Sequence, residues 1–202
     1  MKKTLITILA TVLICACVAG GTIAWLMDKT TPIENTFTVG NVDIELTETG
    51  TTEVDGVFTK EFKMVPGTEI SKDPKVTVKG GSEDCYLFVK IDESADFGNY
   101  ITYSVKTGEG GWTALDSVAG VYYCEVAASD ADQEFQVLTG NDVYTTGMVT
   151  VKDTVTKAMA DALKAETAVK PTLTFTAYAV QKANVADAAT AWGYATAAAN
   201  NS

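Results

Sequence analysis

Carboxylates and thiols are the side chains that could do chemistry in this 202-residue chain, because the sequence contains no histidine. A zinc peptidase of the HExxH kind needs two histidines one helical turn apart to hold the metal and a glutamate to activate water. The Ser-His-Asp and Cys-His nucleophile systems also require an imidazole. The sequence therefore predicts no enzyme of these classes, and we assign no catalytic residue and no cofactor.

Two short clusters of carboxylates lie in regions that the sequence predicts to be loops. Their oxygen atoms suit calcium far better than a hydrolytic zinc. Charge runs in an acidic chain usually face water, so we interpret the clusters as solvated loops and keep a calcium site as the alternative. No pair is singled out for glycoside hydrolysis. The residues are Asp92, Glu93 and Asp96 in the first cluster, and Asp130, Asp132 and Glu134 in the second.

The N-terminus has the pattern of a secretory signal. Lys2 and Lys3 precede an uncharged, largely apolar run over residues 4–27. Thr22 and Ala24 occupy the −3 and −1 positions of a cut between Ala24 and Trp25. Residues 1–24 are therefore a predicted signal peptide, and the protein is expected to be exported and to meet the membrane only through this leader.

Two other fates of the leader remain open. Residues 5–27 form an apolar run of roughly 20 residues, long enough to stay in the bilayer as an uncleaved anchor. Residues 14–17 weakly resemble a lipobox, in which Cys17 would carry the lipid. Either fate would tether the protein to the membrane.

Two cysteines, Cys85 and Cys124, lie in the predicted exported body. An even pair in an extracytoplasmic protein is a candidate disulfide. The bond would close a loop of about 40 residues and contribute roughly 4 kcal/mol. The alternative is two buried free thiols on neighbouring strands, which behave as small hydrophobic groups.

The composition excludes nucleic acid as a partner. The chain has 26 acidic and 15 basic residues, all of the latter lysine, for a net charge of −11. Such a body repels nucleic acid, and it lacks the bidentate arginine fork that usually reads phosphate.

Alternation of apolar and polar residues with period two dominates the body and predicts strands with one buried face. The segment 85–91 is apolar on both faces, so we expect it at the centre of a sheet. The predicted strands cover 42–46, 62–64, 76–78, 85–91, 100–105, 121–126, 134–138, 144–151 and 172–179.

The sequence predicts two helical segments. Thr154 or Thr156 caps a helix over 157–166, and the alanine-rich tail 185–199 favours helix by propensity. Many short strands with turn signals predict an all-β fold, a β-sandwich of jelly-roll or immunoglobulin-like kind with one or two short helices. Residues 41–202 are expected to form this single domain after the signal peptide and an N-terminal segment, 25–40.

Four short motifs stand out in the sequence: GGTIAW at 20–25, FTVGNVDI at 37–44, VPGT at 65–68 and KDPKV at 72–76. These motifs resemble the TasA and camelysin family of Gram-positive surface and biofilm-matrix proteins. The resemblance implies a jelly-roll domain, export by a signal peptidase of the SipW type, and extracellular fibres in which the N-terminal segment of one subunit completes the sheet of the next. A sister matrix protein is a further implied partner.

The segment 25–40 suits the role of a donated strand. Trp25 and Leu26 would be exposed apolar residues at a new N-terminus, while Phe37 and Val39 have strand composition. A sandwich with an open edge accepts such a segment by β-augmentation. We name Trp25, Leu26, Phe37 and Val39 as assembly residues.

The sequence thus predicts an exported structural subunit of an extracellular fibre or biofilm matrix, found in the matrix or at the cell surface of a Gram-positive-type bacterium. The family resemblance leaves a camelysin-type surface metallo-endopeptidase as one alternative. A monomeric, calcium-dependent adhesion module is the other.

Overall fold

The computed structural model describes residues 41–54, 57–165 and 167–199. The chain divides into two units, Met1–Thr38 and Val39–Ser202, and every described residue belongs to the second. The predicted cleavage residues Ala24 and Trp25, the lipidation alternative at Cys17, and the assembly residues Leu26, Phe37 and Val39 all lie outside the described residues. Within the described ranges, no helix has the length and apolar character needed to cross a membrane.

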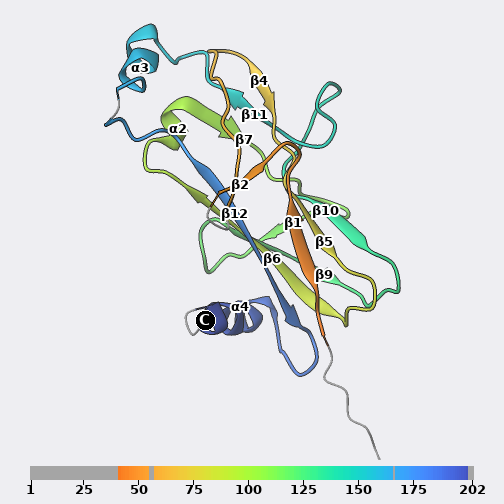
Figure 1. Ribbon diagram of the computed structural model, residues 1–202. Coiled ribbons are helices and arrows are strands. Elements are labelled where there is room, and N and C mark those ends of the chain that lie inside the picture. The colour runs from red at the N-terminus through yellow and green to blue at the C-terminus, as the bar shows by residue number, and fades with distance from the viewer. Residues whose placement is uncertain (1–40, 55–56, 166, 200–202) are drawn as a thin grey trace, which may run out of the picture. The chain divides into compact units, whose positions relative to one another are not determined.

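The described part of the chain consists mainly of short antiparallel strands, which confirms the predicted all-β class (Figure 1). Three short helices are described: α2 (Phe97–Tyr100), α3 (Lys157–Ala162) and α4 (Ala188–Ala199). The strands are β1 (Ile44–Thr47), β2 (Thr52–Val54), β3 (Val57–Thr59), β4 (Glu69–Ser71), β5 (Lys75–Val78), β6 (Cys85–Glu93), β7 (Ile101–Tyr103), β8 (Thr113–Ala114), β9 (Val121–Val126), β10 (Gln133–Gln136), β11 (Met148–Val151) and β12 (Leu173–Gln181).

Four sheets connect these strands. The largest has the order β12-β6-β9-β8, and two three-stranded sheets have the orders β1-β5-β10 and β4-β11-β7. The hairpin β2-β3 forms a separate two-stranded sheet. All the strand pairs are antiparallel, and the longest ladder joins β12 to β6, from Leu173 opposite Glu93 to Gln181 opposite Cys85.

Strand β6 is central in its sheet, as its two apolar faces predict. One face, which carries Leu87 and Val89, packs in the main core with Val76 of β5 and Val149 of β11. This arrangement places the largest sheet against the two three-stranded sheets, as in a sandwich. Each of these four side chains is at most 3% exposed, so the sandwich core is well formed.

Helix α4 covers the other face of β6. Trp192 lies with its ring centroid 5.4 Å from that of Phe88 on β6 and 5.3 Å from that of Tyr178 on β12. Asp187, just before the helix, accepts a hydrogen bond from the backbone N–H of Thr190 at 2.8 Å. This bond lowers the pKa of the Asp187 carboxyl, because it favours the charged form. The alanine-rich tail is therefore a packed third layer.

Helix α3 begins where the sequence indicates but ends earlier. The hydroxyl oxygen of Thr156 accepts a hydrogen bond from the backbone N–H of Met159 at 3.3 Å and so caps the helix. No residue within α3 is buried, although Val155 just before it is 5% exposed. A helix that buries so little gains little from tertiary packing.

Candidate functional site

The first acidic cluster is spread around the end of β6. Asp92 pairs with Lys90, with 2.9 Å between the charged atoms, and Glu93 accepts a hydrogen bond from the hydroxyl of Tyr103 at 2.7 Å. Burial raises the pKa of the Tyr103 hydroxyl, and its hydrogen bond to Glu93 adds to that shift. Asp96 accepts a long hydrogen bond from the Asn99 amide at 3.4 Å. Each of these carboxylates therefore has its own donor.

The second cluster is held in the same way. The Oδ1 atom of Asp132 accepts the backbone N–H of Gly80 at 2.9 Å, and its Oδ2 lies 3.5 Å from the Lys79 ammonium. The Gly80 bond is the main cause of the lowered pKa of Asp132, with a smaller contribution from Lys79. Glu134 pairs with Lys75 at 2.7 Å.

Asp130 is exposed, and its backbone carbonyl group approaches the turn at Gly80. A Cβ atom at Gly80 would lie 2.3 Å from the Asp130 carbonyl oxygen, so the approach requires glycine. Among the residues that the structure describes, no three His, Cys, Asp or Glu side chains are arranged to hold a metal ion. In these ranges Asp92, Glu93, Asp96, Asp132 and Glu134 each have a donor of their own, so the calcium site considered for the two clusters stays an untested alternative.

Cys85 and Cys124 are free thiols on the neighbouring strands β6 and β9. The register pairs Cys85 with Val126 and Cys124 with Leu87, so the two cysteines are diagonal neighbours. Diagonal positions typically lie about 7–8 Å apart, whereas a disulfide needs Cα atoms within about 6.8 Å. The predicted disulfide is thus absent from this structure, and the register is the physical reason.

The environment of these two thiols disfavours the thiolate form. Burial raises the pKa of Cys85 to about 11 and that of Cys124 to about 12. The thiolate is the nucleophilic form of cysteine, so raised pKa values suppress reactivity near neutral pH. Neither cysteine has the features of a catalytic nucleophile.

A largely buried ion pair between Glu48 and Lys72 joins two segments that lie apart in the sequence. The Lys72 ammonium lies 2.8 Å from Oε2 of Glu48, and the two side chains are 11% and 12% exposed. The same ammonium lies 5.4 Å from the ring centroid of Phe62 and 5.2 Å from that of Phe175. These distances are within the range of cation–π attraction. The ion pair joins the residue after β1 to the residue after β4, and the contact of the Lys72 ammonium with Phe175 extends this link to β12.

Two sheet edges that have no partner strand among the described residues come together beside this ion pair. Strand β1 ends one three-stranded sheet, β12 ends the four-stranded sheet, and the two strands lie against each other without forming a ladder. Apolar side chains of both strands, Ile44 and Leu46 on β1 and Phe175 and Ala177 on β12, contact the main core. Sequence periodicity could identify both strands, but it carried no signal of which edges remain open.

The described residues form an antiparallel β-sandwich in which β1 and β12 are edge strands of their sheets. Comparison with family models makes the assignment more specific. The chain belongs to the camelysin metallo-endopeptidase family, whose model matches residues 1–103, and this is a family of surface or secreted proteins. The match extends through β7. Comparisons with curated proteins and with solved structures found no match.

The family description implies a catalytic metal, and the residues of this chain do not fit one. The whole sequence lacks histidine, the usual nitrogen ligand of a peptidase zinc. In the described ranges the carboxylates and thiols also fail to converge in groups of three. We therefore derive no reaction step through a metal.

Proposed function

We propose that this protein is an exported structural subunit of an extracellular fibre or biofilm matrix and that its subunits assemble by donation of the N-terminal segment 25–40. In this proposal the leader, residues 1–24, is removed on export. The protein then acts in the matrix or at the cell surface, with a second copy of itself as the main partner.

The observation that carries this proposal is that, in the described part of the chain, β1 and β12 are edge strands with a ladder partner on one side only. An edge strand offers unpaired N–H and C=O groups, and an extended peptide can satisfy them by adding a strand. Natural proteins usually blunt such edges, so a nine-residue edge as long as β12 is an appropriate acceptor for a partner strand.

The composition of segment 25–40 supports its role as the donor. Phe37 and Val39 alternate with polar residues, which allows one face of an added strand to contact an apolar core. The contact would join the N-terminus of one subunit to the edge of another. Such a heterologous contact need not close on itself and produces filaments rather than rings.

Electron microscopy of two proteins tests the proposal directly. Residues 25–202 and residues 40–202 are purified, incubated over a series of salt concentrations and pH values, and imaged by negative stain over time. We expect filaments only from the longer protein. Equal polymerisation of both proteins, or no polymerisation of the longer one under every condition, would exclude strand donation.

The peptidase suggested by the family description is the competing function. We expect purified protein to show no casein cleavage that a chelator abolishes, because it has no imidazole ligand. Elemental analysis of the same sample provides the control. Chelator-sensitive cleavage together with a stoichiometric metal would favour the peptidase.

A further inference from the structure

The outer face of the sheet β1-β5-β10 carries a row of polar side chains. These three strands lie side by side (Figure 1). One set of alternate residues on them, with Val76 at its centre, packs in the main core, so the other set faces outward. The register aligns Thr47, Lys75 and Gln136 in one row across this outer face. The row therefore brings a hydroxyl, an ammonium and an amide group together on neighbouring strands.

This row lines a polar cleft of about 470 Å³. Residues from three other segments complete the lining: Glu48 and Thr49 follow β1, Asp73 precedes β5, and Thr146 precedes β11. Glu134 of β10 is also part of it. The volume falls within the range of roughly 300–1,000 Å³ that is typical of small-molecule sites. Because Thr49 and Thr146 are exposed, a ligand can reach the cleft from solvent.

Contacts within the lining hold its polar side chains in place. Each contact uses only part of a group's hydrogen-bonding capacity, since a carboxylate has a second oxygen, an amide has an oxygen besides its N–H groups, and an ammonium has three donors. The cleft thus presents both donors and acceptors at positions that are already fixed. The contacts are Thr49 N–H to Oδ1 of Asp73 at 3.2 Å, Lys75 to Oε1 of Glu134 at 2.7 Å, and the Gln136 amide to the carbonyl of Thr146.

The charges in the cleft disfavour a charged ligand. Glu134 is paired with Lys75, and Glu48 is paired with Lys72, so a cation entering the cleft would meet ammonium groups beside these carboxylates. An anion would meet Asp73 and a chain of net charge −11. Among the described residues, no three His, Cys, Asp or Glu side chains are arranged to hold a metal ion. A neutral ligand rich in hydroxyl groups, which both donate and accept, matches this lining.

We propose that this cleft binds a neutral carbohydrate, with Asp73 and Gln136 accepting hydrogen bonds from sugar hydroxyls and Lys75 donating to them. The inference goes beyond the proposed function, because it requires neither a second copy of the chain nor segment 25–40. Binding here uses side chains on a sheet face and leaves the backbone groups of the sheet edges untouched.

The affinity of one such site is expected to be low. The described residues that line the cleft include no aromatic side chain on which a sugar ring stacks. Hydrogen bonds to a sugar replace hydrogen bonds to water and give a small net gain, so we expect a dissociation constant of about 1–10 mM. Weak sites bind firmly when many linked copies contact one polymer.

An NMR titration tests the site in unmodified protein. The probes are glucose, galactose, mannose and N-acetylglucosamine, added separately to freshly purified monomer of residues 25–202, which retains the whole unit Val39–Ser202. We expect at least one sugar to produce saturable shifts of the backbone amides of Thr47, Lys75 and Gln136 and of the Gln136 side-chain amide. Methylammonium and acetate at the same concentrations should give no saturable shift there. The inference is overturned if no sugar gives saturable shifts, if the shifts lie outside the cleft, or if only the charged probes bind.

Two glutamines on β10 provide a matched pair of variants. Gln136 and Gln133 each donate from Nε2 to a backbone carbonyl, of Thr146 and Ala127 respectively, but of these two glutamines only Gln136 lines the cleft. Gln136→Leu should weaken sugar binding about tenfold, because it removes a donor and an acceptor without changing the charge. Gln133→Leu should stay within about twofold of the unmodified protein. Equal weakening by both substitutions would contradict the assignment, and the amide spectra show whether each variant is folded.

The outcomes also separate this inference from the proposed function. The same preparations are imaged by negative stain for filaments. Sugar binding at the cleft in a protein that never forms filaments leaves this inference standing while the proposed function fails. Filaments from a protein whose cleft signals respond to no sugar overturn this inference and leave the proposed function intact.

Discussion

The carboxylate of Glu48 is bound to Lys72 through one oxygen only: Oε2 lies 2.8 Å from the ammonium, and Oε1 is buried with no hydrogen-bond partner in the described structure. Burial of an incompletely paired charge is costly, and a buried ion pair is weak evidence of net stabilisation. The pair instead fixes where the chain leaves β1 and where the Lys72 ammonium meets the rings of Phe62 and Phe175. We therefore interpret the Glu48–Lys72 pair as a contact that positions these groups and adds little net stability.

Loss of Lys72 alone should therefore lower the free energy of unfolding much more than loss of both members of the pair. Lys72→Met leaves the Glu48 carboxylate buried without a cation, and we expect the free energy of unfolding to fall by about 3–5 kcal/mol. The double variant Glu48→Gln with Lys72→Met should recover most of this loss. Urea unfolding followed by circular dichroism measures both variants, and equal losses in the two would contradict the interpretation.

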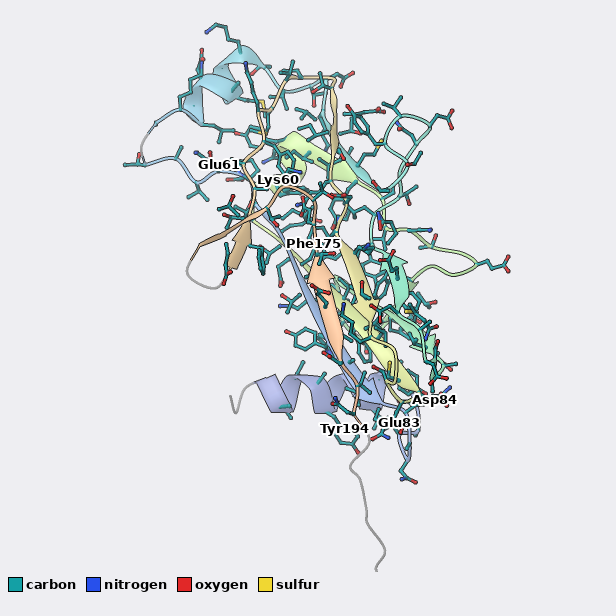
Figure 2. The ribbon with its side chains drawn as sticks, turned by 45° about the vertical axis from the view of Figure 1, so that its right-hand side comes forward. Lys60, Glu61, Glu83, Asp84, Phe175 and Tyr194 are labelled. Atoms are coloured by element: carbon teal, nitrogen blue, oxygen red, sulfur yellow. The ribbon has the colours of Figure 1, made fainter. Side chains whose placement is uncertain are left out.

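The packing of α4 predicts a large effect at Trp192. This side chain is 8% exposed between Phe88 and Tyr178, so Trp192→Ala should lower the free energy of unfolding by about 3–5 kcal/mol. Tyr194→Ala on the same helix is the control, because Tyr194 is 57% exposed (Figure 2). We expect a change within about 0.5 kcal/mol there. Thermal unfolding of both variants distinguishes a packed helix from a frayed tail.

The two thiols should react slowly in the native protein and rapidly after unfolding. Their raised pKa values, to about 11 for Cys85 and about 12 for Cys124, leave little thiolate near neutral pH. Alkylation followed by mass spectrometry should find two modified cysteines in urea without a reductant. A native mass two hydrogens lower, with no alkylation before reduction, would show that the exported protein forms the bond after all.

The same pKa values predict a loss of stability at alkaline pH. Unfolded cysteines titrate near about 8.5, well below the values of Cys85 and Cys124 in the fold. Above that pH the unfolded state binds fewer protons than the native state, so the free energy of unfolding falls as pH rises through the folded pKa values. The urea concentration at the midpoint of unfolding, measured between about pH 8 and about pH 11, should show this decline. A Cys85→Ala, Cys124→Ala double variant should show a shallower slope, and an identical slope would assign the effect to other groups.

Several features of the protein were fixed by composition and local pattern. The lack of histidine alone removes the usual peptidase metal site, whatever the fold. The all-β class follows from alternation along many short segments, and the central position of β6 follows from its two apolar faces. The cap of α3 at Thr156 is equally local, because it depends on one side chain and a backbone group three residues away.

Only the tertiary structure decided which strands pair and which strands of the described chain lie at a sheet edge. The alternation of residue types in 60–64 indicates that alternate side chains are buried, but it does not indicate whether the backbone pairs with another strand. The spacing of Cys85 and Cys124 likewise could not reveal a diagonal register. The helical propensity of the tail did not reveal that Trp192 packs on Phe88. Registers, edges and layers arise from contacts between residues far apart in the chain, and local propensity carries no information about those contacts.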